Sequence, residues 1–327
     1  MDSRQRFKLT MNYGQPDRVP YFEEGIRDDV LTAWRLEGMP AGISFSTLFD
    51  TDRQEEFAPE VDPIPWLKSW PKDASGLKML RERLDPNDKR RLPQHWKEKL
   101  QGWKNRDHVL MLRVNRGLFQ TLGIEDWRRF SEVIYLFKDQ PEYVHEVLEI
   151  HSSFVSALID RILEDVDIDA AIFSEPIGGN SGPLISPRMY EEFALRGYKP
   201  VLDTLQRHGV KTIILRTYAN SRLLIPKILR RGFNCLWACE VETEAMDYRS
   251  IREEFGRDLR LIGGIDLDTL LESEEAIQRE LKEKVPPLLE QGGYVPLADG
   301  RVRKGVPYDR YVYYRRLLED LILEHAG

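Results

Sequence analysis

Short apolar runs alternate with longer amphipathic stretches along most of this chain, and no other feature limits its fold as strongly. The runs have strand length and are rich in branched residues, at 108–115, 168–175, 211–217, 233–240, 259–265 and 293–298. Residues 18–25 form a plausible seventh run, in which Pro20 suits an edge position. We therefore expect six or seven strands.

The stretches between the runs carry helix start and stop signals. Residues 141–164 begin with Pro141, and proline is favoured in the first helical turn. Residues 186–209 open on Ser186 and Pro187 and end on Gly209. Further helices are expected near residues 250–255, 273–290 and 308–325.

Repeated strand–helix units with short connections are typical of a parallel α/β fold. The chain contains no GxGxxG loop and no GxxxxGK loop of the kind that open nucleotide-binding sheets use. The pattern therefore predicts a single-domain (β/α)8 TIM barrel over residues 1–327, with a generic α/β protein as the alternative. Residues 41–106 interrupt the pattern and are dense in Pro, Trp and charge, so we interpret them as an insertion that forms a lid or rim.

The composition excludes several classes of partner. A formal net charge of -7, with acidic and basic residues interleaved, does not suit a nucleic-acid-binding surface. No stretch approaches the roughly 18 consecutive apolar residues that span a membrane, and the polar N-terminus lacks a secretory signal core. We expect a cytoplasmic protein that binds neither nucleic acid nor membrane.

In an α/β barrel the catalytic groups lie at the C-terminal ends of the strands. The polar residues that end the apolar runs here are Glu23, Glu24, Arg27, Asn115, Arg116, Glu175, Arg216, Tyr218, Cys239, Glu240, Asp266, Asp299 and Arg301. We expect them to meet at one mouth, where carboxylates and guanidinium groups suit an anionic substrate and acid–base chemistry.

Each of these residues also has a structural interpretation. Asp266 has the position of a helix N-cap. Glu175 and Glu240 each follow an apolar strand, so both would be buried near the barrel axis unless they are paired. Arg216 would either pair with one of those two carboxylates or bind a substrate carboxylate through two hydrogen bonds.

The two cysteines, Cys235 and Cys239, cannot build a disulfide framework. Residues four apart in a strand lie about 13 Å apart, which is too far for one zinc ion unless the strand ends or bulges between them. We interpret both as buried structural thiols and keep Cys239 and Glu240 as weak metal candidates. None of the six histidines is well placed as a general base.

Five segments, in order along nearly the whole chain, resemble the uroporphyrinogen decarboxylase superfamily, which also contains cobamide-dependent methyltransferases. They are GQPDRVPYFEEG (14–25), SGPLISPRMYEEF (181–193), LIGGIDLDTL (261–270), IQRELKEKVPPLLEQGGYVP (277–296) and VPYDRYVYYRRLLED (306–320). TAWRLEGMP (32–40) further resembles uncharacterised members often called decarboxylase-like. The resemblance implies a (β/α)8 barrel and decarboxylase-like activity.

The sequence departs from that superfamily where the site is expected. In place of Arg216 and Tyr218, zinc methyltransferases carry a His-x-Cys-Gly motif and decarboxylase-like relatives an Asp-Ser-Asp-Gly run. An arginine cannot ligate zinc. Asp299 is followed by Gly300, where relatives show a histidine.

A second departure follows the first strand. The decarboxylase itself carries an Arg-Gln-Ala-Gly-Arg stretch there, whereas this chain keeps only Arg27 and adds Glu23 and Glu24. The added acids would repel a tetrapyrrole with eight carboxylates, which argues against uroporphyrinogen itself as the substrate.

We therefore predict a decarboxylase-like lyase that acts on a carboxylate-bearing substrate by acid–base chemistry, without a bound metal or other cofactor. The residues assigned to catalysis are Glu175, Glu240, Tyr218 and Asp299, and those assigned to substrate binding are Arg27, Arg216, Asp266 and Glu23. Two alternatives stay open. One is a methyltransferase component with a corrinoid protein as its partner, and the other is a degenerate barrel that binds a ligand, such as a tetrapyrrole-like one, without turnover. Relatives often pair, so a homodimer is also open.

Overall fold

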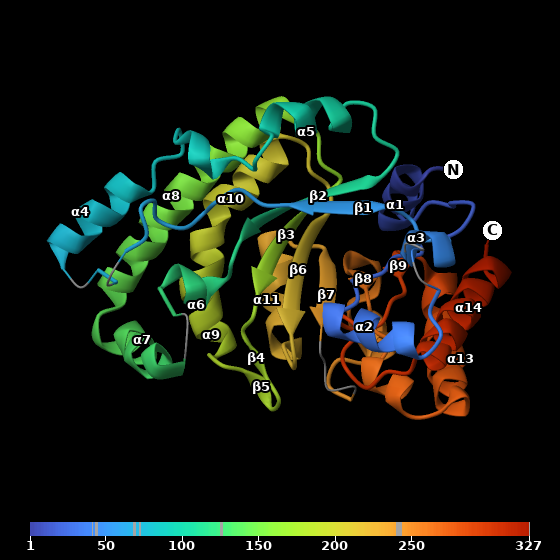
Figure 1. The fold of residues 1–327 in the computed structure, drawn as a ribbon. Coiled ribbons are helices and arrows are strands. Elements are labelled where there is room, and N and C mark those ends of the chain that lie inside the picture. The colour runs from blue at the N-terminus through green and yellow to red at the C-terminus, as the bar shows by residue number, and fades with distance from the viewer. Residues whose placement is uncertain are drawn as a thin grey trace.

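The computed structural model describes residues 1–40, 42, 45–67, 70–71, 73–124, 127–239 and 244–326. The centre of this described part is a curled parallel sheet of seven strands (Figure 1). In sheet order they are β1 (Gln54–Phe57), β2 (Val109–Asn115), β3 (Ala170–Glu175), β6 (Ile213–Tyr218), β7 (Cys235–Cys239), β8 (Arg260–Ile262) and β9 (Tyr294–Val295). All neighbouring strands are parallel, which confirms the α/β prediction.

The expected first strand, residues 18–25, does not form a regular strand. It is followed by an isolated parallel bridge between Ile26 and Val302. Its backbone nevertheless bonds to the segments that flank the two edge strands, β1 and β9. Before β1, Asp52 N–H donates to the Tyr21 carbonyl at 3.0 Å, and after β9, Val302 N–H donates to the Gly25 carbonyl at 2.9 Å. The curled sheet is thus confirmed, whereas full closure into eight strands stays a prediction.

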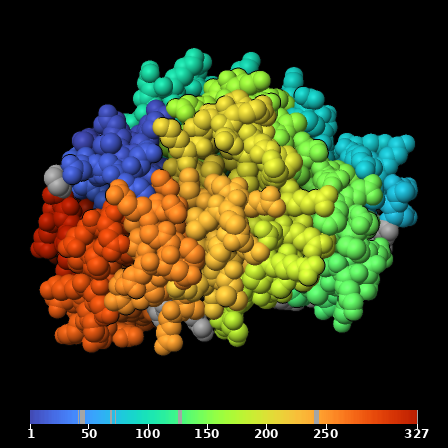
Figure 2. All heavy atoms as spheres, turned by 180° about the vertical axis from the view of Figure 1, so that it is seen from behind, coloured from blue at the N-terminus to red at the C-terminus, as the bar shows by residue number. Residues whose placement is uncertain are grey.

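Helices other than α1, which packs against the inner face, cover the outer face of the sheet. The longer ones are α1 (Ser3–Met11), α2 (Asp28–Leu36), α4 (Ala74–Arg83), α5 (Trp96–Trp103), α7 (Trp127–Asp139), α8 (Pro141–Asp165), α10 (Arg196–Arg207), α11 (Ile225–Arg231), α12 (Tyr248–Phe255), α13 (Glu274–Gln291) and α14 (Tyr308–Glu324). Seen from behind, the helical layer runs in chain order from green at α7 to red at α14 (Figure 2). Among the described residues no helix is long and apolar enough to cross a membrane.

Short elements connect the rest. They are α3 (Phe45–Leu48), α6 (Leu118–Thr121), α9 (Pro187–Met189), the hairpin strands β4 (Gly178–Gly179) and β5 (Gly182–Pro183), and the 3₁₀ turns η1 (Lys89–Arg91), η3 (Arg222–Leu224), η4 (Gly256–Asp258) and η5 (Leu267–Leu271). The predicted helix at 186–209 begins as expected, with the Ser186 hydroxyl accepting from Met189 N–H at 3.2 Å. It is divided by a π-helical stretch, η2 (Tyr190–Leu195), between α9 and α10.

The segment 41–106 is more than the lid or rim that we predicted. It supplies β1, whose residues pair with β2 in register from Gln54 with Val109 to Phe57 with Leu112. Its charged sequence, QEEF, hid this strand because only Phe57 is buried in it.

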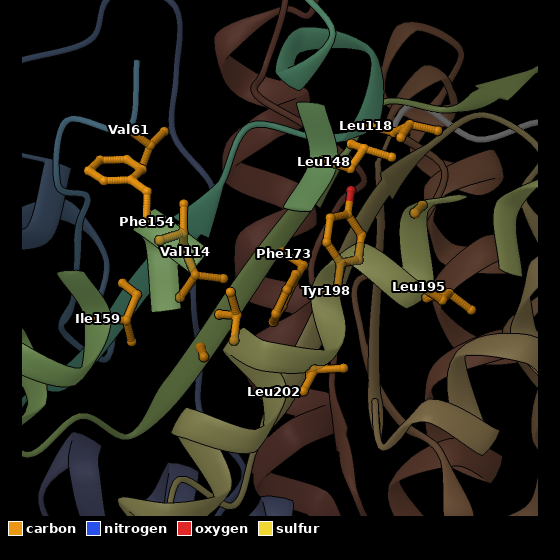
Figure 3. Close-up of a cluster of buried hydrophobic side chains, with 14 of the residues drawn as sticks. Val61, Val114, Leu118, Leu148, Phe154, Ile159, Phe173, Leu195, Tyr198 and Leu202 are labelled. Atoms are coloured by element: carbon orange, nitrogen blue, oxygen red, sulfur yellow. The ribbon is translucent and has the colours of Figure 1, made fainter. Parts of the chain in front are cut away.

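Two apolar layers lie on opposite faces of the sheet. The inner face is formed by Phe22, Val109, Met111, Ala170, Ile172, Ile214, Cys235, Trp237, Cys239, Ile262, Val295 and Leu297, with Phe7 and Met11 of α1 packed against them. The outer face packs under the helices, as Phe173, Val114 and Tyr198 do between the sheet, α8 and α10 (Figure 3). Since successive strand residues alternate between faces, this division fixes which polar side chains enter the inner face.

Candidate active site

The inner face carries a cluster of polar side chains near the C-terminal ends of the strands. Its members come from six places in the chain: Glu24, Glu56, Arg113, Arg216 with Tyr218, Cys239 and Asp299. Convergence of these strand-end groups agrees with the expectation for an α/β barrel mouth. The individual partners differ from those that we predicted.

Arg216 lies on the inner face of β6 and is held by a carboxylate. Its Nη1 donates to Glu56 Oε2 at 3.0 Å, its Nη2 donates to Glu56 Oε1, and its guanidinium lies 3.8 Å from the Trp237 ring centroid. The arginine is 8 % exposed, so this two-point pairing compensates a buried charge. We expected Glu175 or Glu240 as the partner, and Glu56 of β1 takes that place instead.

Asp299 is a buried carboxyl group with one oxygen satisfied. Its Oδ1 accepts from Gly264 N–H at 2.8 Å, whereas its Oδ2 has no hydrogen-bond partner among the described residues. Burial raises the pKa of Asp299 well above its usual range, and the negative charge of Glu24 adds to this shift. This shift favours the protonated form of Asp299, which is the form that can donate a proton.

The two glycines of the GGID segment make room for this acid. A Cβ on Gly263 would lie 2.5 Å from Asp299 Oδ1, and a Cβ on Gly264 would lie 2.5 Å from the ring of Tyr248. Their φ angles, 101° and 89°, are also strained for other residues. The Tyr248 ring cannot move easily, because its hydroxyl accepts from Ala238 N–H at 2.9 Å and donates to the Ile262 carbonyl at 2.8 Å.

The substitution Gly264→Ala is accordingly expected to lower the free energy of unfolding by about 1–3 kcal/mol. Urea denaturation measures the change. Gly256→Ala is the matched control, because Gly256 also has a positive φ, of 56°, but a Cβ there would meet nothing within 4 Å. Equal decreases in the free energy of unfolding for the two variants would show that backbone strain alone causes the loss and that the Tyr248 ring moves aside.

Glu24 and Cys239 face each other beside Asp299. The Cys239 thiol donates to both oxygens of Glu24, at 3.5 and 3.6 Å, and Gly300 N–H donates to Glu24 Oε2 at 3.2 Å. Burial raises the pKa of the Glu24 carboxyl and raises that of the Cys239 thiol well above its usual range. Cys239 is thus a protonated, buried thiol, and the described residues contain no group of three His, Cys, Asp or Glu side chains that could hold a metal ion.

Glu23, which we assigned to substrate binding, points away from this cluster. It accepts from the Tyr311 hydroxyl and, at 3.4 Å, from Arg315 Nη1, so it ties the segment to α14. The inner-face acid is its neighbour Glu24. The buried residues Tyr21 and Phe22 belong to the outer and inner layers respectively, and that alternation is the signal that distinguishes the two acids.

Glu175 likewise lies on the outer side of the sheet. It accepts from Leu118 N–H at 2.9 Å, from the Tyr190 hydroxyl at 3.4 Å and from the Tyr198 hydroxyl. Figure 3 shows the Tyr198 hydroxyl directed toward Leu118 and Leu148, away from Phe173. Burial raises the pKa of Glu175 to about 7, although its three hydrogen bonds act in the opposite direction and lower it. The structure does not bring Glu175 together with Asp299.

The remaining assigned residues are scattered. Asp266 caps η5, accepting from Asp268 N–H at 2.9 Å, which matches the structural alternative that we gave for it. Arg27 is exposed at the start of α2. Tyr218 is half-buried and packs against the inner-face layer beyond Arg216. Glu240 lies outside the described residues.

The sequence and the structure were compared with those of known proteins. The sequence model of the family described as uroporphyrinogen decarboxylase (URO-D) matches residues 125–296, which is more than half of the chain. No curated protein sequence matches. Among solved structures, a uronate isomerase from Bacillus halodurans C-125 matches with a TM-score of 0.36 and 11% identity over 78% of this chain, which spans 60% of that protein's length. The chain belongs to the uroporphyrinogen decarboxylase family.

Proposed function

We propose that this protein is a decarboxylase-like enzyme that acts on a carboxylate-bearing substrate by acid–base chemistry. The observation that carries the proposal is Asp299, a buried carboxyl group on the inner face whose Oδ2 has no hydrogen-bond partner among the described residues and whose pKa is raised by burial. A buried polar atom without a partner costs about 1–3 kcal/mol, so its presence calls for an explanation, and a catalytic role is the one proposed for Asp299. Family membership supports the reaction class.

In the proposed reaction the bond between a substrate carbon and its carboxylate breaks, carbon dioxide leaves, and the electron pair stays on the carbon. A carbonyl or aromatic ring of the substrate delocalises that pair. Asp299 then gives its proton to the carbon, and the resulting Asp299 carboxylate recovers a proton from water. Tyr218 would donate a hydrogen bond to the charge that develops on the substrate.

The substrate is small or medium in size in this proposal. Arg216 is already paired with Glu56, and Glu24 faces the same space, so a ligand with many carboxylates would meet two acids there. Two buried free cysteines suit a reducing compartment, and we propose a cytoplasmic location.

A ligand-binding protein without turnover is the second candidate, because Arg216 and Tyr218 stand where the resemblance implies two functional acids, and Arg216 is held by Glu56. Methyl transfer with a corrinoid protein partner is the remaining alternative.

One assay separates the three. The protein is incubated in D₂O with carboxyl-¹³C-labelled arylacetic, 3-oxo and pyrrole carboxylic acids and with uroporphyrinogen, and labelled carbon dioxide is followed by NMR. Decarboxylation is expected to release label and to place one deuterium on the carbon that lost the carboxylate. Binding without release would favour the ligand-binding protein, whereas transfer of a methyl group from an added methyl donor to added cob(I)alamin would favour methyl transfer.

A further inference from the structure

A cavity of about 380 Å³ opens at the carboxyl ends of β1 and β2. Its walls are residues 58–62, which follow β1, residues 90–93 around η1, and the β2 residues Arg113, Asn115 and Arg116. Ligand pockets in proteins are typically about 300–1,000 Å³, so one small organic group fits here. Nothing in the reaction proposed above uses this cavity.

The cavity wall is positively charged on a chain whose net charge is -7. Its charged lining residues are the arginines 90, 91, 113 and 116 and the acids Glu60 and Asp62. Arg116 pairs with Asp62, and Arg90 pairs with Asp88 outside the lining. The lining therefore carries more guanidinium groups than carboxylates, which favours an anionic occupant.

Arg91 contributes a buried charge that no carboxylate neutralises within ion-pair distance among the described residues. It is 1 % exposed, and its guanidinium donates to the backbone carbonyls of Glu60 and Asp85, at 3.1 and 3.2 Å, and to those of Asp62 and Arg83. These bonds fix the wall of the cavity in place. They also leave the positive charge of Arg91 to act on whatever enters.

Arg113 is the group that a ligand can reach. It follows Val109 and Met111 on the inner face of β2, and it is exposed where both of those residues are buried. Among the described residues it has no ion pair and no side-chain hydrogen bond, in contrast to Arg216 and Arg116. An arginine left free at a strand end can bind an oxyanion through two parallel hydrogen bonds.

We propose that this cavity binds a second oxyanion of the substrate, a carboxylate or a phosphate, and that Arg113 is the residue that contacts it. The proposal rests on the proposed function and makes it narrower: the substrate carries an acid group besides the carboxylate that is lost. Glu56, which holds Arg216, precedes the cavity residue Ala58 by only two positions. The cavity wall thus continues directly from the strand that contributes Glu56 to the inner-face cluster.

Isothermal titration calorimetry at low ionic strength tests the cavity without any assay of turnover. The probes are inorganic phosphate and glutarate, and the proteins are the wild type, Arg113→Gln and Arg81→Gln. Arg81 is the matched control because it is an exposed arginine that pairs with Glu146 and does not line this cavity, and its loss changes the net charge equally. Far-UV circular dichroism confirms that each variant is folded.

We expect saturable binding of one probe per chain, weakened about tenfold or more in Arg113→Gln and unchanged in Arg81→Gln, since a charge-assisted bidentate contact is lost. Tighter phosphate binding would identify a phosphorylated substrate, and tighter glutarate binding a dicarboxylate. Equal affinities in all three proteins, or no saturable binding, would overturn the proposal. Loss of probe binding in Arg113→Gln, combined with no decarboxylation of any acid, would refute the proposed function and leave the anion site standing.

Discussion

Asp299→Asn is expected to reduce decarboxylation by about 10²–10⁴-fold, the usual contribution of a positioned proton donor. The amide oxygen can still accept from Gly264 N–H, as Oδ1 does now at 2.8 Å. The amide nitrogen takes the place of the unpartnered Oδ2, so the shape of the site is kept. Only the transferable proton is removed. Steady-state rates on the acid that the labelled-carbon assay identifies measure the effect.

The control for this substitution is Asp268→Asn. Asp268 belongs to the neighbouring GGID-containing segment, is exposed and pairs with Arg303 on the surface, so the charge change is the same. Its rate should equal that of the wild type. If Asp299→Asn keeps more than about a tenth of the wild-type rate, Asp299 is not the proton donor and the reaction that we propose is wrong.

The pH dependence of decarboxylation is a second test of the role of Asp299. An ordinary aspartate has lost its proton above about pH 4, but burial raises the pKa of Asp299 well above that range. Activity that needs the protonated carboxyl is therefore present at low pH, extends above the range of an ordinary aspartate, and is lost as pH rises through the raised pKa. In the residual activity of Asp299→Asn this alkaline loss should be absent.

Glu175→Gln is expected to remove a fall in stability of about 3 kcal/mol between pH 5 and pH 8. The pKa of Glu175 is raised by burial from 4.5 to about 7 in the folded protein. Between these two values the folded chain binds more protons than the unfolded chain, so the free energy of unfolding decreases as pH rises and levels off above the folded pKa. Glutamine stays neutral throughout and can still accept from Leu118 N–H.

Urea unfolding of the wild type and Glu175→Gln at pH 5, 6, 7 and 8 tests this prediction. The difference between the two proteins is the quantity to compare, because other groups also titrate. Burial lowers the pKa of His151 to about 4, which makes stability rise with pH in the same window, but equally in both proteins. Glu164→Gln, at an exposed position of α8, should behave as the wild type. Parallel curves for all three would mean that Glu175 is ionised in the folded protein.

The parallel α/β architecture could be predicted because each buried strand is a continuous apolar run. Because the runs are apolar throughout, the sequence does not indicate which face of the sheet each residue occupies. Glu175 ends such a run, and nothing in AAIFSE distinguishes its inner from its outer side chains, since both faces are buried. Its assignment to the barrel axis failed for that reason.

A charged strand could not be recognised at all, because it lacks the apolar run that marks the other strands. Glu56 lies in a run with no apolar pattern, so neither β1 nor the partner of Arg216 could be found from the sequence. Asp299 could be proposed from the sequence because it ends an apolar run that is buried on both faces. Its raised pKa depends on that burial and on the nearby charge of Glu24, and these come together only in three dimensions.

The pair between Glu56 and Arg216 joins residues 160 positions apart. During synthesis on the ribosome Glu56 is therefore made long before its partner, and β1 must wait for β2, β3 and β6 before its charge is compensated. The mouth of the sheet cannot be completed on any nascent chain that stops short of β6. Closing so long a loop costs chain entropy, so we expect the candidate site to be among the last parts of the sheet to be completed.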